Sequence, residues 1–371
     1  MWPANDLLTP ALRAPERIAA LTLHDWDLLI RQARRANLLG RLRSALDDAG
    51  LLASCPARPR DHLDAAWIVA EKHAADVRWE IDRIEYALSG IGHPALVLKG
   101  GAYVLAELPT ARGRIFGDVD IMVPKGRLEE VEKILFGHGW MTTHHNAYDQ
   151  RYYRQWMHEL PPLRHMRRRT VLDVHHAILP ETARIHPEPA RLWAAAVAIA
   201  GHPGLKVLAP VDMVLHGAAH LFHDGELEHG LRDLVDLDGL LRYFGGDEAF
   251  WSRLVPRAVE LGLTRPLYYA LRYTTTILAT PVPGPVMADA TVGRPGALLA
   301  PIMDALFSRA LAPDHPSCTS RLTAVARWLL YIRAHYLRMP LHLLIPHLVR
   351  KAIGNRRMRR TRPDRLTARN P

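Results

Sequence analysis

The stretch that decides the fold of this chain is residues 95–124, ALVLKGGAYVLAELPTARGRIFGDVDIMVP. It opens with a short apolar run, residues 95–98, and closes with a second one, residues 118–123, and both are typical of β-strands. In the second run a single apolar residue separates Asp118 from Asp120. Side chains two positions apart on a strand point the same way, about 7 Å apart along the backbone, so we expect the two carboxylates to share one face.

Two carboxylates on one strand face predict a cation site. Mg²⁺ is a hard cation that takes oxygen ligands. The apolar flanks, Ile115-Phe116 and residues 121–123, are those of a buried strand. Burying unpaired carboxylates is costly, and a bound cation is the usual compensation. The alternative is a solvated edge strand or a turn.

The residues between the two runs predict phosphate contacts. Lys99 is followed by Gly100 and Gly101, and two glycines let backbone N–H groups approach a phosphate with no Cβ in the way. Arg114 could hold a phosphate through two parallel hydrogen bonds. The alternatives are a strand that ends in a glycine turn with Lys99 in water, and a surface role for Arg114. A phosphate cradle beside metal-binding carboxylates favours nucleotidyl transfer.

These residues resemble the signature of the polymerase-β-like nucleotidyltransferase superfamily, and within it a large, poorly characterised bacterial family. That family has Lys-Gly, a helix, an Arg and an Asp-x-Asp pair, followed later by a strand with a third Asp and a His. Here the later piece is residues 171–176, VLDVHH, which contains Asp173 and His175. The resemblance covers roughly residues 20–245. Gly117 stands where many relatives carry Ser before the first Asp.

The resemblance implies a magnesium-dependent transferase, with Mn²⁺ as an alternative metal, that uses a nucleoside triphosphate. Asp118, Asp120 and Asp173 would be the catalytic metal ligands, and Asp173 could also act as base for the attacking hydroxyl. His175, on the same strand face as Asp173, would line the substrate site or serve as a structural histidine. From the residues alone, Asp173 could equally be paired with one of the arginines at 167–169. The acceptor stays open among a protein side chain, a small molecule and RNA.

The expected fold is α+β: a mixed-sheet palm, as in polymerase β, flanked by N- and C-terminal helical segments. We expect an N-terminal helical segment (1–90), a catalytic core (91–205), a helical domain (206–280), a Pro-rich linker (281–301) and a C-terminal amphipathic helical segment with a basic tail (302–371). Apolar residues at helical spacing predict helices over 16–52, 62–89, 126–136, 210–244 and 250–278. Strands are predicted at 140–144 and within 151–174, with a hairpin turn near Pro161-Pro162.

Composition places the chain among ordinary folded proteins of a reducing compartment. Of its 371 residues 49% are hydrophobic and 23% charged, and two cysteines cannot form a disulfide framework. The first 14 residues lack a signal-peptide pattern, and no run of about 18 apolar residues predicts a membrane span. We therefore expect a cytoplasmic protein.

The net charge of +10 is concentrated at the C-terminus, where residues 350–371 contain nine Arg or Lys residues and one Asp. The apolar segment just before it, residues 328–349, together with this basic tail resembles an interfacial membrane helix. Peripheral contact with an anionic membrane, at its inner face, is one interpretation. Nucleic-acid contact by the tail, and a helix packed on the body with a free basic end, are the others.

A histidine-rich helix leaves its role open. His216 and His220 are four residues apart on one predicted helix face, with His223 beyond, a spacing that can bind zinc. A helix that lines the nucleotide cleft, or a polar packing seam, is the alternative. For the whole chain, the rival function is a catalytically inactive nucleotidyltransferase fold that binds RNA, a protein partner or the membrane surface.

Overall fold

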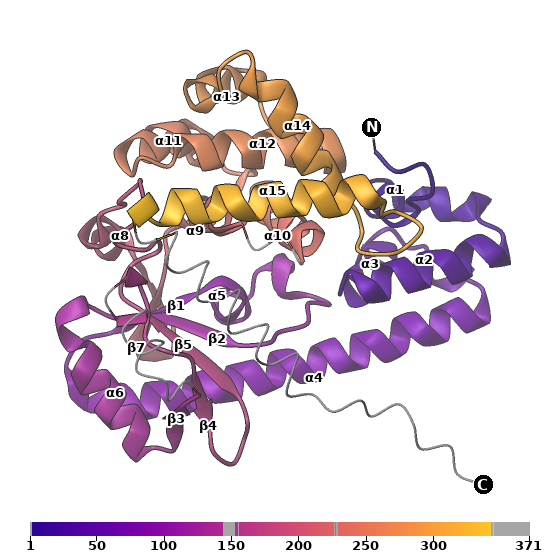
Figure 1. Cartoon of the computed structure of the whole chain (residues 1–371). Coiled ribbons are helices and arrows are strands. Elements are labelled where there is room, and N and C mark those ends of the chain that lie inside the picture. The colour runs from indigo at the N-terminus through magenta and orange to yellow at the C-terminus, as the bar shows by residue number, and fades with distance from the viewer. Residues whose placement is uncertain are drawn as a thin grey trace, which may run out of the picture.

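The computed structural model describes residues 2–143, 153–154, 156–225, 227, 229–342 and 344. A mixed sheet occupies one half of the molecule, and helices surround it on several sides (Figure 1). The fold is therefore α+β, as predicted.

The seven strands of the sheet lie in the order β3-β4-β5-β2-β1-β7-β6. Their bounds are β1 (Ala95–Leu98), β2 (Val119–Met122), β3 (Trp140–Thr142), β4 (Leu163–His165), β5 (Val171–His175), β6 (Val197–Ile199) and β7 (His202–Val207). β2 pairs antiparallel with β1 and parallel with β5, while β1 pairs parallel with β7. The other pairs, β3 with β4, β4 with β5 and β6 with β7, are antiparallel. All residues of β1 and β2 are buried, so the predicted motif forms the centre of the sheet.

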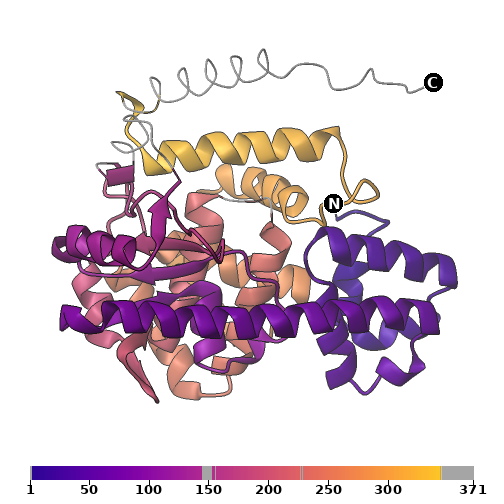
Figure 2. The ribbon, with the colours of Figure 1, turned by 90° about the horizontal axis from the view of Figure 1, so that it is seen from below.

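The N-terminal helices are α1 (Leu8–Arg13), α2 (Leu23–Arg35), α3 (Leu39–Asp48) and the long α4 (Ala57–Leu88). α4 runs beneath the sheet from the N-terminal helices (Figures 1 and 2), and it contacts β2 and β7. A bidentate ion pair fixes it to the sheet: Arg168 donates through Nε and Nη2 to the buried Glu80 carboxylate, at 2.8 and 2.6 Å. Only part of the predicted apolar side of α4 is buried, because Ile68 is 69% exposed on the half of the helix that extends beyond the sheet.

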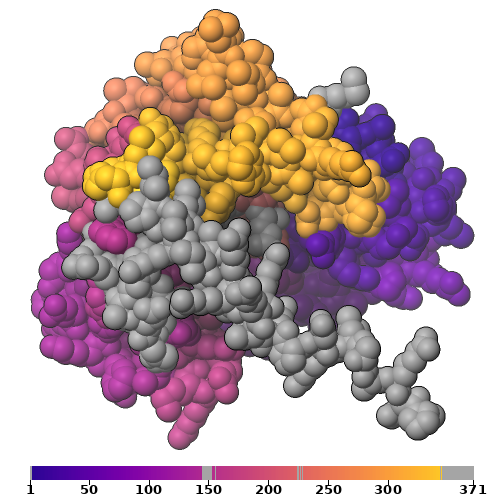
Figure 3. All heavy atoms as spheres, viewed as in Figure 1, coloured from indigo at the N-terminus to yellow at the C-terminus, as the bar shows by residue number. Residues whose placement is uncertain are grey.

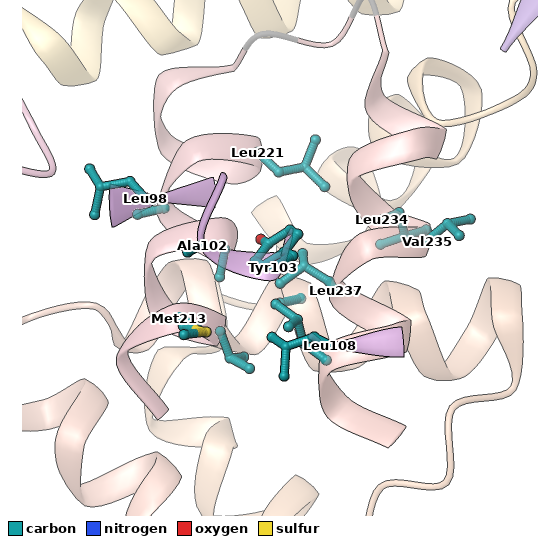
Figure 4. Packing of buried hydrophobic residues seen from close by; sticks show 14 of the residues in the cluster. Leu98, Ala102, Tyr103, Leu108, Met213, Leu221, Leu234, Val235 and Leu237 are labelled. Atoms are coloured by element: carbon teal, nitrogen blue, oxygen red, sulfur yellow. The ribbon is translucent and has the colours of Figure 1, made fainter. Parts of the chain in front are cut away.

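The remaining helices belong to the core, the region after β7 and the C-terminal segment. They are α5 (Lys99–Leu105), α6 (Leu128–Gly137), α8 (Pro189–Ala195), α9 (Pro210–Ala219), α10 (Gly230–Phe244), α11 (Glu248–Glu260), α12 (Thr264–Leu278), α13 (Gly284–Asp289), α14 (Leu299–Ala310) and α15 (Arg321–Arg338). α5 is packed against α9 and α10 by an apolar cluster. Figure 4 shows Ala102 and Tyr103 of α5 facing Met213, Leu234 and Leu237.

One sequence prediction is wrong. The hairpin turn does not lie at Pro161-Pro162 but between β4 and β5, where Arg169 has the left-handed backbone (φ 67°) that a tight turn needs. The prolines instead precede β4, and Leu160 already bonds to the Val174 carbonyl.

The segment expected to be a Pro-rich linker, 281–301, has secondary structure of its own. This segment contains α13 and a 3-10 turn (Ala290–Gly293) that packs on α12. Pro285 lies in the first turn of α13, a position where proline is favoured.

The C-terminal segment begins with α14 and α15, which pack against each other. Among the helices that the structure describes, none has the length and apolar character needed to cross a membrane. The predicted basic tail, and the strand residue His144, lie outside the described residues.

Candidate active site

The hydrogen-bonded register of β2 and β5 brings two predicted carboxylates together. In this parallel pair Asp120 lies directly beside Asp173. On the other side of β2, Asp120 lies opposite Leu98, the last residue of β1, so Lys99 follows at the same place. The central strands therefore bring residues from three distant parts of the sequence to one point.

Asp118 precedes β2 and is exposed to solvent, whereas Asp120 is almost completely buried. The negative charge of Asp120 is the largest influence that raises the pKa of Asp118. Like charges on one strand face oppose each other unless a cation lies between them. The two carboxylates are therefore close enough to influence each other, while their joint metal binding stays a prediction.

Asp120 is held by two cationic groups. Lys99 Nζ donates to its Oδ1 at 2.8 Å, and His175 Nε2 donates to the same oxygen at 3.1 Å. Burial alone would raise the pKa of Asp120, but Lys99 and His175 hold it well below its usual range. Burial would likewise lower the pKa of Lys99, and the Asp120 carboxylate outweighs it and raises that pKa. Asp120 therefore stays ionised and binds positive charge.

Asp173 is in the opposite situation. Its Oδ1 is buried and accepts no hydrogen bond. Burial, together with the Asp120 charge, raises its pKa to about 7. The arginine alternative fails for Arg168, which pairs with Glu80 on α4 instead. A buried carboxylate oxygen with no partner, beside a second carboxylate, is the kind of ligand that a cation would satisfy.

The two glycines after Lys99 serve close packing. A Cβ on Gly100 would lie 2.5 Å from Arg114 Nη1 and 2.8 Å from the Phe116 ring, and one on Gly101 would lie 2.9 Å from Val97 Cγ1. Lys99 itself has a left-handed backbone, with φ 46°. This sharp turn from β1 into α5 directs the Lys99 side chain to Asp120.

Arg114 is neither free nor on the surface. Its Nε donates to Asp236 Oδ2 of α10 at 2.9 Å, and only 11% and 7% of the two side chains are exposed. Its guanidinium lies 5.0 Å from the centre of the Phe116 ring. The arginine therefore links the segment before β2 to the helical region after β7.

Sequence reasoning missed Glu159 and His158. Glu159 forms an antiparallel bridge with His175, and its carboxylate lies 3.3 Å from His175 Nδ1. The His158 ring stacks on the His175 ring with centroids 5.2 Å apart. The sequence around them, WMHELPP, has no periodic pattern, so only the pairing with β5 reveals them.

His175 is consequently flanked by carboxylates on both ring nitrogens. Burial lowers the pKa of His175, but Asp120 and Glu159 outweigh that effect and raise it. His158, Glu159 and His175 are also the one His/Cys/Asp/Glu group, within the described ranges, whose ligand atoms all lie within 4.8 Å of one another. The three predicted Asp residues are not gathered so closely here, and Lys99 is in contact with Asp120.

The histidine-rich helix borders the same site. His216 lies in the last turn of α9, and His220 begins the π-helix that follows (His220–Asp224). Burial is the main cause that holds the pKa of His220 well below its usual value, and the charges of Lys99 and His216 add to it. The charges of Lys99 and Asp120 both act on His220, and α9 packs on α5, the helix that begins at Lys99, so the histidine-rich helix lies close to the carboxylates.

The donor set of the site fits a hard divalent cation. Asp118, Asp120 and Asp173 offer carboxylate oxygens, which Mg²⁺ and Mn²⁺ prefer. The Lys99 ammonium already provides positive charge at Asp120, and the buried Oδ1 of Asp173 has no donor. All three residues could therefore hold such an ion.

Comparison of the sequence with known proteins identifies a family. A family described as "Uncharacterised nucleotidyltransferase" matches residues 22–279, which include every predicted site residue. No curated protein and no solved structure matches the chain. The match covers most of the chain, and we conclude that this protein belongs to the uncharacterised nucleotidyltransferase family.

Proposed function

We propose that this protein transfers a nucleoside monophosphate group from a nucleoside triphosphate to an acceptor, and releases pyrophosphate. The sheet would then be a palm of the polymerase-β type. The observation that carries the proposal is the register of Asp120 beside Asp173 on adjacent parallel strands, with Asp118 two residues before Asp120 and Lys99 bonded to it.

Asp118, Asp120 and Asp173 would hold Mg²⁺, or Mn²⁺ in its place. When bound, the ion supplies Lewis-acid polarisation of the phosphate and neutralises charge on the attacking and leaving oxygens.

Asp173 is suited to receive the proton of the acceptor. Its Oδ1 is buried without a hydrogen-bond partner and lies beside Asp120, so this carboxylate is open to a proton from a bound acceptor. In the proposed step the acceptor O–H gives its proton to Asp173, and the acceptor oxygen forms a bond to the α-phosphorus. The bond from that phosphorus to the bridging oxygen breaks, and pyrophosphate leaves with the bonding electron pair.

Lys99 supplies a mobile positive charge for the triphosphate. Its Nζ is bonded to Asp120, so phosphate would compete with that carboxylate for the ammonium. His175 holds the other side of Asp120, and Arg114 supports the loop through Asp236. We assign Lys99 to phosphate binding and Arg114 to positioning, with His175 at the border of the substrate site.

Calorimetric titration of each nucleoside triphosphate with Mg²⁺ tests the proposal. Wild type should bind at least one of them in a metal-dependent way, and Asp118→Ala/Asp120→Ala protein should not. Once an acceptor is found, full activity of an Asp118→Ala variant would contradict the mechanism. The acceptor classes to screen are protein side chains, small metabolites and RNA ends.

One observation favours a second candidate, a nucleotidyltransferase fold that binds without catalysis. A Cβ on Gly100 or Gly101 would clash with Arg114, Phe116 or Val97, so close packing explains both glycines without a bound phosphate. Under this alternative neither wild type nor the double mutant binds nucleotide. Deletion of residues from 350 onward then abolishes partner binding and its steep dependence on salt.

A further inference from the structure

Helix α15 presents an apolar outer face to solvent. From residue 322 to residue 336, all of the exposed side chains are aliphatic or aromatic: Leu322, Ala324, Val325, Trp328, Leu329, Tyr331, Ile332 and Tyr336. Trp328 is 60% exposed and Leu322 59%. Figure 3 shows α15 as a ridge across one face of the molecule. Large contiguous apolar surfaces of this kind mark interaction sites.

Two arginines within this stretch, Arg327 and Arg333, are bonded to the protein body. Arg327 donates to Asp314 at 2.7 Å, and Arg333 donates to the Phe222 carbonyl at 2.8 Å. Ala326, Leu330 and Ala334 are buried on the inner side. The inner face therefore fixes α15 to the body, so folding of the described chain does not use the outer face.

The sequence that follows α15 supplies the complementary charge. Nine Arg or Lys residues and one Asp lie between positions 350 and 371. Leu344 is the last described residue, six positions before Arg350. Six extended residues span at most about 20 Å, so the basic segment starts close to the end of the apolar face.

We propose that the outer face of α15 docks on an anionic lipid surface, with the basic C-terminal segment contacting the headgroups. Apolar burial at the headgroup boundary and attraction to anionic lipid add, and two such contributions give stable peripheral binding where one gives marginal binding. Trp and Tyr suit this depth, since their rings are apolar and one edge is polar. A protein interface is usually rimmed by polar and charged groups, whereas none of the exposed side chains from residue 322 to residue 336 is charged.

Docking on this face would keep the candidate site near the membrane. The π-helix that carries His220 packs on the inner side of α15, where Gly225 approaches so closely that a Cβ would lie 2.6 Å from Ala334 Cβ. Helix α15, whose outer face would contact lipid, and the π-helix beside the candidate site thus form one packed unit.

The test is sedimentation of the full-length protein with vesicles of phosphatidylcholine alone and of phosphatidylcholine with phosphatidylglycerol. We expect binding to the anionic vesicles only. Two changes, Trp328→Glu/Ile332→Glu and deletion of residues 350–371, should each weaken it at least about tenfold, because each removes one of two additive contributions. The matched control is Ile68→Glu/Val69→Glu on α4, away from α15, where both side chains are also exposed.

Three results would overturn the proposal. The first is wild-type binding by the Trp328→Glu/Ile332→Glu variant, with its fold verified by circular dichroism. The second is a wild-type dimer that this variant converts to a monomer without any vesicle binding, which would assign the face to a second copy. The third is tight binding of single-stranded RNA that depends on the tail alone, with no sedimentation on vesicles. Loss of nucleotide binding would not affect any of these readouts, so the lipid proposal and the proposed catalytic function fail separately.

Discussion

Replacement of Asp173 by Asn should stabilise the protein at neutral pH while removing the cation site. Burial raises the pKa of this carboxyl from the ordinary 3.8 to about 7. The unfolded chain therefore loses the proton near pH 4, whereas the folded chain keeps it until about pH 7. The folded state binds more protons across this window, so stability falls as the pH rises through it. Asn has the same shape and no charge, so the variant does not lose this stability as the pH rises.

The size of the effect follows from the same values. One pKa unit corresponds to about 1.4 kcal/mol, so the interval from 3.8 to about 7 sets a ceiling of about 4 kcal/mol. Because Asp173 is only partly buried, we expect about half of that ceiling. The Asp173→Asn replacement should raise the free energy of unfolding by about 2 kcal/mol above pH 7 and by close to zero at pH 4.

Urea unfolding of wild type and Asp173→Asn at several pH values measures the difference. Added Mg²⁺ should stabilise wild type, by about 2.7 kcal/mol at a hundredfold excess over Kd, and should leave the variant nearly unchanged. Equal destabilisation of the variant at pH 4 and pH 8 would refute the burial argument. A full Mg²⁺ response by the variant would remove Asp173 from the metal site.

Further predictions concern the packing around the site. Arg168→Ala leaves the Glu80 carboxylate buried without its partner and should lower the free energy of unfolding in urea by about 3–5 kcal/mol. A loss under about 1 kcal/mol would mean that water takes the place of Arg168 beside Glu80. Gly100→Ala should cost about 1–3 kcal/mol because its Cβ meets Arg114 and Phe116, while Gly117→Ser, in open space, should leave the unfolding midpoint unchanged. Lys99→Met should lower stability without Mg²⁺, because it leaves Asp120 without the ammonium. The same variant should bind Mg²⁺ more tightly in calorimetry, since the ammonium no longer competes with the ion for Asp120. Weaker Mg²⁺ binding would show that Lys99 does not compete.

Sequence reasoning was most successful where function and local pattern coincide. The spacing of Asp118 and Asp120 on a short apolar run indicated a buried strand, and β2 has that character. The register of β2 and β5 brings Asp120 and Asp173 together, while their role as cation ligands stays a prediction. The helical regions followed from apolar periodicity, although α4 exposes Ile68 where it leaves the body.

Contacts between distant residues could not be predicted in this way. Arg114 and Asp236 are 122 positions apart, and neither has a local pattern that names the other. Glu159 joins the site only because the chain before β4 pairs with the end of β5. β6 and β7 were also missed as strands: β6 is short and has no buried residue, and β7 begins with His202-Pro203-Gly204, which is not a typical strand sequence.

The parallel pairing of β2 with β5 has a consequence for how this family can diversify. Backbone hydrogen bonds set the position of Asp173 relative to Asp120, while a long segment of the chain, residues 123–170, connects the two strands in sequence. Insertions and deletions in that segment can therefore reshape what surrounds the site, provided that β5 returns in the same register. A shift of the β5 register by one residue would turn Asp173 to the opposite face of the sheet and separate it from Asp120. Length variation among relatives should accordingly concentrate in this segment, and engineered loops for a new acceptor belong there.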